Sequence, residues 1–141
     1  MKTDTIPKDV QEKYIEIQTV DQQMKAVQQK MEKLEEQYYE LLSVIQDMDD
    51  MKKVEKNADA LVPVHNGIFL KAKILDTDHL HVNVGSGTVV EKTVEEVKQI
   101  LVSQGSEIKK TQKELESHFN QLLDRLKQLD EEITLAMQKN V

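Results

Sequence analysis

The stretch from Leu61 to Lys92 decides the fold, and it reads LVPVHNGIFLKAKILDTDHLHVNVGSGTVVEK. Three of the four glycines in the chain fall here, with one of its two prolines. β-Branched residues recur with a period of two, and turn signals separate the runs, which is typical of short strands. The sequence on either side is charged and has a helical period. We therefore predict a small β insert, residues 61–92, between two long helices.

Two turns divide this insert into two β-hairpins. Asn66-Gly67 readily takes a positive φ, and Gly85-Ser86-Gly87 is a second tight turn. Four short strands cannot close a barrel alone, and they leave open edges and uncovered apolar faces. The insert is therefore expected to pair with strands of other subunits. The residues expected to carry this oligomerisation are Val62, Val64, Ile68, Leu70, Ile74, Leu80, Val82, Val84 and Val89.

The first helix is expected over residues 6–57, with Thr5 as its N-cap and Pro7 in its first turn. Apolar residues follow one another along it at alternating steps of three and four, which is the pattern of a coiled coil. The seam consists of Ile17, Val20, Met24, Val27, Met31, Leu34, Tyr38, Leu41, Ile45 and Met48.

The second helix is expected over residues 93–139, opened by a capping box of Thr93 and Glu96. Its seam has the same spacing and runs from Leu101 through Gly105, Ile108, Gln112, Leu115, Phe119, Leu122, Leu126, Leu129 and Ile133 to Ala136. Because the insert is a turn, the seams can be laid antiparallel, with Met48 opposite Leu101 and Ile45 opposite Gly105. We expect Ile45 to fill the space beside the glycine; a flexible base is the alternative.

The expected fold class is α+β. It consists of a long antiparallel two-helix coiled coil with two β-hairpins between the helices, and the hairpins pair with strands of other subunits. The 141 residues form a single domain, with few aromatic residues and 32% charged ones, as suits long helices with a narrow buried seam.

Charge and composition exclude several classes of partner. The net charge of −7 argues against nucleic acid or an anionic membrane as the main partner. The absence of cysteine excludes disulfides and thiolate sites. No apolar run approaches the roughly 18–20 residues of a membrane span, and the N-terminus lacks the apolar core of a signal peptide. We expect a soluble intracellular protein.

The insert also contains a weak metal-binding pattern. His79 and His81 lie beside Asp76 and Asp78, but no third ligand is set by the spacing, so a solvated strand face is the favoured interpretation. The glycines of the second turn are followed by strand rather than helix, which disfavours phosphate binding. No set of nucleophile, base and orienting group can be placed. The expectation is no enzyme, no metal and no cofactor.

The ends of the two helices are unusually apolar. Both termini should lie at the end of the coiled coil far from the insert, and some apolar side chains there lie off the seam. Such a surface can hold another apolar chain, although scattered apolar residues at fraying helix ends are the alternative. The residues expected to bind another apolar chain are Val10, Tyr14, Ile15, Ile17, Ile133, Leu135 and Met137.

Several runs in the insert resemble the prefoldin family, in particular its α-class subunit of archaeal type, and they are also similar to the eukaryotic α-type subunits. These runs are Leu61-Val62-Pro63-Val64, Phe69-Leu70-Lys71-Ala72, Asp76-Thr77-Asp78, Val84-Gly85-Ser86-Gly87 and Val90-Glu91-Lys92-Thr93. The helices resemble the family only in their pattern. His65-Asn66 stands where smaller residues are expected, so the first turn differs from the family.

The resemblance implies a hetero-hexamer with two α-class and four β-class subunits, whose hairpins assemble into an intersubunit β-barrel that forms a platform for the coiled coils. It also implies an ATP-independent chaperone that binds unfolded or nascent proteins at the coiled-coil tips and delivers them to a group II chaperonin. The alternative is a structural coiled-coil adaptor or a filament-forming prefoldin-like protein. A metal-dependent enzyme is the least favoured hypothesis.

Overall fold

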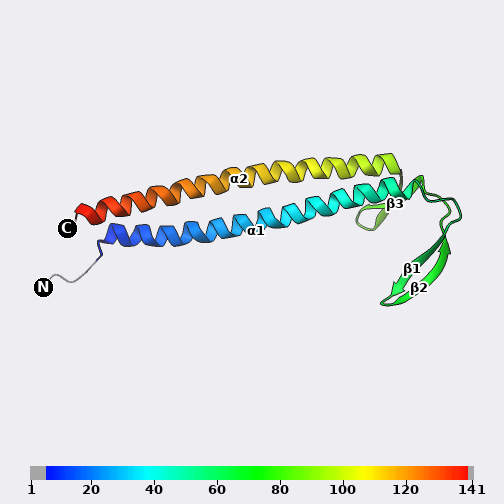
Figure 1. The fold of residues 1–141 in the computed structure, drawn as a ribbon, viewed down its shortest axis with the longest axis horizontal. Coiled ribbons are helices and arrows are strands. Elements are labelled where there is room, and N and C mark those ends of the chain that lie inside the picture. The colour runs from blue at the N-terminus through cyan, green and yellow to red at the C-terminus, as the bar shows by residue number, and fades with distance from the viewer. Residues whose placement is uncertain (1–5, 140–141) are drawn as a thin grey trace. The chain divides into compact units, whose positions relative to one another are not determined.

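The computed structural model describes residues 6–139, so the expected cap Thr5 lies outside the described residues. The elements follow in the order shown in Figure 1: helix α1 (Lys8–Met51), strands β1 (Asp59–His65), β2 (Ile68–Lys73), β3 (His79–Gly85) and β4 (Thr88–Thr93), and helix α2 (Val94–Lys139). β1 pairs with β2 and β3 pairs with β4, both antiparallel. This confirms two long helices with two β-hairpins between them.

The chain is composed of two compact units. The terminal unit contains Met1–Glu36 and Ile108–Val141, and the central unit contains Gln37–Glu107. Each helix contributes to both units, whereas all four strands belong to the central one.

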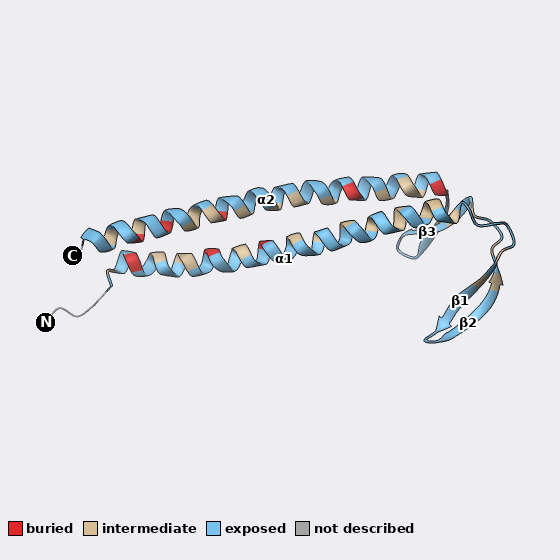
Figure 2. Ribbon diagram, viewed as in Figure 1, coloured by how far each residue is buried: buried red, intermediate tan, exposed pale blue. Residues whose placement is uncertain are grey.

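The core of the terminal unit is the predicted seam. Its buried centre is formed by Val20 and Val27 from α1 with Leu122 and Leu129 from α2 (Figure 2). Six partly buried seam residues pack around this centre: Ile17, Met24, Met31, Leu115, Phe119 and Leu126. Each aliphatic side chain removed from water contributes about 1.5–3 kcal/mol, so this narrow strip can hold the two helical segments together.

In the central unit the expected helix register at Gly105 is wrong. Gly105 is buried, and a Cβ atom at its position would lie 3.2 Å from Leu41 Cδ2 and 3.5 Å from Tyr38 Cε2. Leu41 and Tyr38, rather than Ile45, therefore fill the space beside the glycine. The spacing of apolar residues determines which faces meet, but the stagger of two helices depends on how side chains fit, and the missing side chain lets Leu41 approach closely.

The first hairpin has two distinct faces. Ala60 pairs with Ala72 and Val62 pairs with Leu70, which places small and apolar side chains together on one face. The turn ends at Gly67, whose φ of 74° favours glycine, as expected from Asn-Gly. A register shift near the turn accommodates one extra residue in β1.

The second hairpin is also closed by a two-residue turn. Val82 pairs with Val90, and both turn residues, Ser86 and Gly87, have positive φ values of 52° and 74°. Two consecutive residues with positive φ form a type I′ turn, whose twist matches that of the flanking strands. Val94 N then donates to Asp78 O at 3.1 Å, which connects the start of α2 to the segment that leads into β3.

The first helix ends earlier than expected, at Met51 rather than at residue 57. Asn57 takes a left-handed φ of 67°, and its N–H donates to Ile74 O at 2.7 Å. Ile74 N in turn donates to Ala58 O at 2.9 Å. The chain leaves the helix because these backbone bonds extend the first hairpin, which the sequence pattern of the helix alone does not reveal.

Candidate functional site

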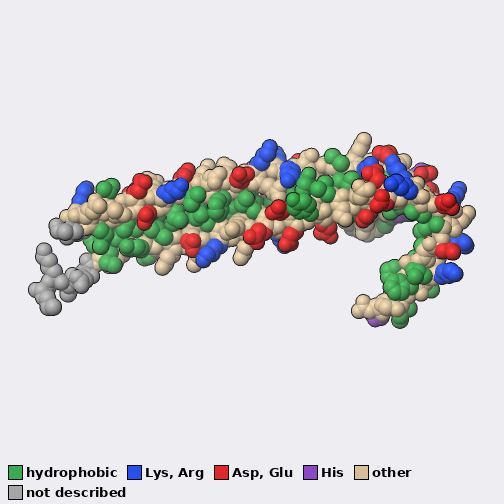
Figure 3. All heavy atoms as spheres, in the orientation of Figure 1, with side chains coloured by type: hydrophobic (Ala, Val, Ile, Leu, Met, Phe, Trp, Pro, Cys, Tyr) green, Lys and Arg blue, Asp and Glu red, His purple; other side chains and the backbone are tan. Residues whose placement is uncertain are grey.

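An apolar surface lies at the ends of the helices in the terminal unit. We call Tyr14, Ile15, Leu135 and Met137 the end surface; their side chains are 46%, 62%, 58% and 43% exposed. An ion pair of 3.7 Å between Lys13 Nζ and Glu132 Oε2 places the two helical segments next to each other at this level. Hydrophobic side chains are visible on this part of the molecule in Figure 3. Water is therefore in contact with four large apolar side chains from two helices.

The other three residues expected in this region are not freely exposed. Val10 and Ile133 are buried and Ile17 is partly buried. In this chain they pack the helix ends together instead of facing solvent. The seven predicted residues thus divide into three that build the helix ends and four that form the end surface.

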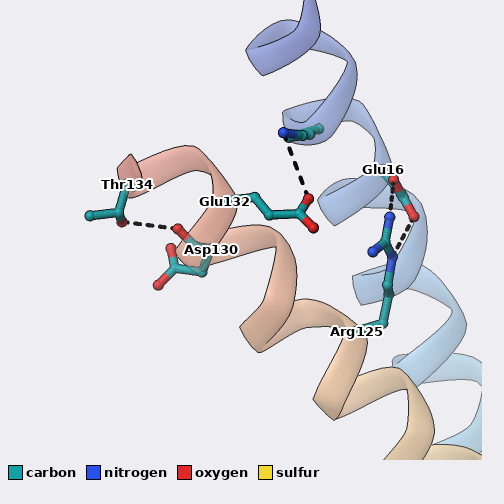
Figure 4. Close-up of polar contacts among 6 residues, drawn as sticks. Glu16, Arg125, Asp130, Glu132 and Thr134 are labelled. Atoms are coloured by element: carbon teal, nitrogen blue, oxygen red, sulfur yellow. Dashed lines mark hydrogen bonds and ion pairs between the residues drawn. The ribbon is translucent and has the colours of Figure 1, made fainter. Parts of the chain in front are cut away.

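A bidentate ion pair holds the helices just inside the end surface. Arg125 on α2 donates two hydrogen bonds to the carboxylate of Glu16 on α1, at 2.8 and 2.9 Å (Figure 4). The hydrogen bond to Arg125 lowers the pKa of Glu16 below its ordinary value of 4.5. Two parallel charge-assisted bonds fix orientation as well as distance, so this pair positions the two helical segments.

Most of the residues predicted to drive assembly lie on the surface of this single chain. Both sheets are two-stranded, so each described hairpin has two edges without a neighbouring strand. Exposed apolar side chains on hairpins are expected to be covered by a partner. Val62, Val64, Ile68, Leu70, Val84 and Val89 are exposed, whereas Ile74, Leu80 and Val82 are partly buried.

The sequence interpretation missed the apolar character of the opposite face of the first hairpin. Leu61 and Phe69 are 68% and 55% exposed, and Phe69 lies directly opposite Pro63 in the register. Near the turn, this hairpin therefore carries apolar side chains on both faces. Strands that are apolar on both faces are typically buried on both sides. The uninterrupted apolar runs before and after the turn were the sequence signal that could have predicted this second apolar face.

The base of the second hairpin gathers polar groups. Asp76 Oδ1 accepts from the backbone N–H groups of Asp78 and His79, at 2.8 and 3.3 Å, and Asp76 Oδ2 lies 2.9 Å from His79 Nδ1. The hydrogen bond from Asp78 N lowers the pKa of Asp76, and the hydrogen bond to Asp76 raises the pKa of His79. Glu91 from β4 completes a group of three whose ligand atoms lie within 4.8 Å of one another. Asp78 and His81, which were part of the weak metal-binding pattern in the sequence, do not belong to this group, and Glu91 was not part of that pattern.

Comparison with known proteins decides the family. A family model described as prefoldin subunit matches residues 20–139, which include most of both helices and all four strands. The chain belongs to the prefoldin family. The resemblance seen in the insert is therefore confirmed over most of the chain.

Among curated relatives, prefoldin subunits of the alpha type match nearly end to end. Prefoldin subunit alpha of Archaeoglobus fulgidus is 24% identical over 132 residues, which cover 94% of this chain and 96% of the relative. Prefoldin subunit alpha of Pyrococcus horikoshii is 29% identical over 137 residues, covering 92% and 93%. Both relatives are of the α class, as the resemblance in the insert implied.

A solved prefoldin has the same fold. The structure of filamentous prefoldin from Methanocaldococcus jannaschii superimposes with a TM-score of 0.73 at 18% identity, covering 82% of this chain and 96% of the other. Prefoldin subunits are non-enzymatic chaperone subunits that assemble with one another, which agrees with the expectation that this chain is not an enzyme. Among the described residues, no helix is long and apolar enough to cross a membrane.

Proposed function

We propose that this chain is a subunit of an ATP-independent cytoplasmic chaperone that binds unfolded or nascent proteins and delivers them to a group II chaperonin. The observation that carries the proposal is the end surface, where Tyr14, Ile15, Leu135 and Met137 are exposed together at the ends of two paired helices. An unfolded chain offers apolar side chains that such a surface can cover. Weak contacts at one pair of helix ends become useful when several subunits act at once.

The second part of the proposal is a hetero-hexamer of two α-class and four β-class subunits. Two separate two-stranded sheets are marginal in water, because each has open edges and too little apolar surface to cover its own faces. Strands from neighbouring subunits would pair with these edges, and the apolar side chains of both hairpins would become the interior of an intersubunit β-barrel. Val62 and Leu70 share a face of the first hairpin and Val82 and Val90 share a face of the second, so these four are among the residues that would be buried. Val89, which was expected to contribute to assembly with Val82, lies instead on the opposite face, paired with Asn83.

Client binding is tested with the assembled complex and a quadruple variant of the end surface. Tyr14, Ile15, Leu135 and Met137 are changed to serine, and the complex is assayed for slowing the aggregation of several unrelated unfolded proteins without ATP. The expected result is loss of protection with an unchanged oligomeric mass. Removal of the helix ends would be less informative, because it would also delete the buried Val10 and Ile133.

A matched control is available in the central unit. Tyr39, Leu42 and Val102 are exposed apolar residues of the helices that lie outside the terminal unit. Changing these three to serine also removes large exposed apolar side chains from both helices and should leave protection intact. If the control variant and the end-surface variant lost protection against aggregation equally, specific binding at the helix ends would be contradicted.

Assembly is tested by placing a charge on one face of the second hairpin. Val82→Asp should prevent assembly with a β-class subunit while leaving helicity largely unchanged. A carboxylate on the apolar face cannot be buried in the interface without a hydrogen-bonding or oppositely charged group beside it. Asn83→Asp is the control, since it adds the same charge at the next position, on the opposite face, and its side chain can still accept from Gly85 N. A complex of normal mass from Val82→Asp would contradict the proposed platform.

A structural adaptor or filament-forming protein is the second candidate. The observation in its favour is the shared fold with a filamentous prefoldin, although the two chains are only 18% identical. Electron microscopy and mass measurement of the chain alone separate the candidates. Long polymers of the chain alone, without protection of unrelated clients, would favour the filament; a defined complex formed only with a β-class partner, with broad protection, would favour the chaperone.

A further inference from the structure

The polar group at the base of the second hairpin has the composition and spacing of a metal site. Asp76, His79 and Glu91 each offer one ligand atom, and these atoms lie within 4.8 Å of one another. One imidazole and two carboxylates form a donor set that suits divalent transition ions such as zinc, cobalt and nickel. We propose that these three residues bind one such ion per chain, with water completing its coordination.

The closest pair already has the separation of two ligands on one ion. His79 Nδ1 and Asp76 Oδ2 are 2.9 Å apart. Two atoms that each lie roughly 2.1 Å from a common ion are roughly 3 Å apart at the right angle of an octahedral ion and roughly 3.4 Å apart around a tetrahedral one. The same separation suits a hydrogen bond, so an ion would take the place of the Nδ1 proton. The charged ring would release that proton to solvent and keep the proton on Nε2, which leaves a neutral imidazole ligand. Little movement of either side chain is then required.

Asp76 is held in place by the backbone. Its Oδ1 atom accepts from two N–H groups, those of Asp78 and His79, which leaves Oδ2 as the atom directed at the imidazole. Hydrogen bonds that orient a ligand from outside the coordination sphere increase metal affinity. The side chains of His79 and Asp76 are each about half exposed, at 47% and 48%, so an ion can enter directly from water.

Glu91 comes from a different strand. It lies opposite His81 in the β3–β4 register, on the face that His79 shares, and its carboxylate lies within 4.8 Å of the ligand atoms of the other two residues. An ion bound by all three residues would connect the segment before β3 to strand β4. Binding of the ion would therefore stabilise only the second hairpin. The first hairpin should be unaffected and can be measured alongside it for comparison.

The test uses the untagged full chain and zinc chloride alone. Isothermal titration calorimetry should show one saturable site per chain, and His79→Gln or Glu91→Gln should weaken binding about tenfold or more. His65→Gln is the matched control, because His65 is an exposed histidine in the first hairpin. Two different metal-binding residues are changed separately, so that an unexpected structural effect of one substitution does not decide the result.

The location is tested by NMR of labelled histidine rings during a titration with cobalt chloride. The His79 signal should respond first and saturably, while His65 and His118 remain unchanged until much higher concentrations. Hydrogen exchange with zinc present should slow in β3–β4 and not in β1–β2. The absence of saturable binding, binding that survives both ligand variants, or equal responses of all four rings would overturn the proposal.

Discussion

Arg125 on α2 holds Glu16 on α1 through two parallel hydrogen bonds, from Nε to Oε1 at 2.8 Å and from Nη2 to Oε2 at 2.9 Å. The pair lies in the terminal unit beside the end surface and bridges two segments that are 109 positions apart in the sequence. Bidentate pairing requires the planar guanidinium, so lysine cannot replace it in this geometry.

The Glu16–Arg125 pair should make helix stability depend on pH in the acid range. The pKa of Glu16 is lower in the folded chain than its ordinary value of 4.5. Because the pKa of Glu16 is lowered by folding, its contribution to stability is complete at any pH above its ordinary pKa. That contribution is lost as the pH falls through the pKa that Glu16 has in the folded chain. Thermal unfolding followed by circular dichroism should show that the natural chain loses stability more steeply than Glu16→Gln between neutral pH and about pH 3.

Asp21→Asn is the control for this experiment, because Asp21 pairs with Lys25 within a single helix and does not bridge the two segments. Its pH dependence should follow that of the natural chain more closely than Glu16→Gln does. Identical curves for the natural chain and Glu16→Gln would contradict the prediction.

Leu129→Ala should destabilise the chain strongly. Leu129 is fully buried between the helices, and truncation of such a leucine costs about 2–5 kcal/mol through lost burial and the cavity left behind. Leu135→Ala makes the same chemical change at an exposed position of the same helix. Thermal or urea unfolding should show a clear decrease for Leu129→Ala and little change for Leu135→Ala; similar decreases would show that burial in the structure is misassigned.

Gly105→Ala should change stability only slightly. Alanine gains about 1 kcal/mol over glycine inside a helix, but its Cβ would lie 3.2 Å from Leu41 Cδ2, so Leu41 must move by a few tenths of an ångström. Gly105→Leu has no space and should cost about 1–3 kcal/mol through overpacking. The double variant with Leu41→Ala should recover part of this loss in urea unfolding, and no recovery would mean that Leu41 does not fill the space.

Ser86→Asn should stabilise the second hairpin. Ser86 has a φ of 52°, in the left-handed region that costs most residues about 1–2 kcal/mol and that asparagine tolerates well. Ser86→Val should have the opposite effect, because a β-branched side chain is poorly accommodated there. Hydrogen exchange in β3 and β4 should slow in the first variant and accelerate in the second, whereas β1 and β2 should not change. Faster exchange in the asparagine variant would contradict this turn geometry.

Local signals in the sequence account for much of the fold. Asn66-Gly67 and Ser86-Gly87 marked both hairpin turns, and alternation along 68–74 and 80–84 assigned residues to strand faces. Thr93 was recognised as a helix cap, and its Oγ1 accepts from Glu96 N at 3.2 Å. These features are determined by a few neighbouring residues, which is why they could be read without a structure.

Features that depend on distant residues were harder to predict. The end of α1 was placed too late because Ile74, which bonds to Asn57, is remote in the sequence. Val10 and Ile133 were assigned to a surface although both are buried, since exposure depends on how the opposite helix covers them. Glu91 was overlooked because only strand pairing brings it near Asp76 and His79.

Periodicity and turn chemistry, both encoded within short windows, were sufficient to specify two coiled-coil helices, two hairpins between them and the residues of the seam. The tertiary structure alone decided the contact of Gly105 with Leu41 and Tyr38, the division of helix-end residues into buried and exposed sets, and the convergence of three polar side chains at the second hairpin. The physical reason is that a period tells which face of an element is apolar, whereas stagger and burial depend on the shapes of side chains contributed by another part of the chain.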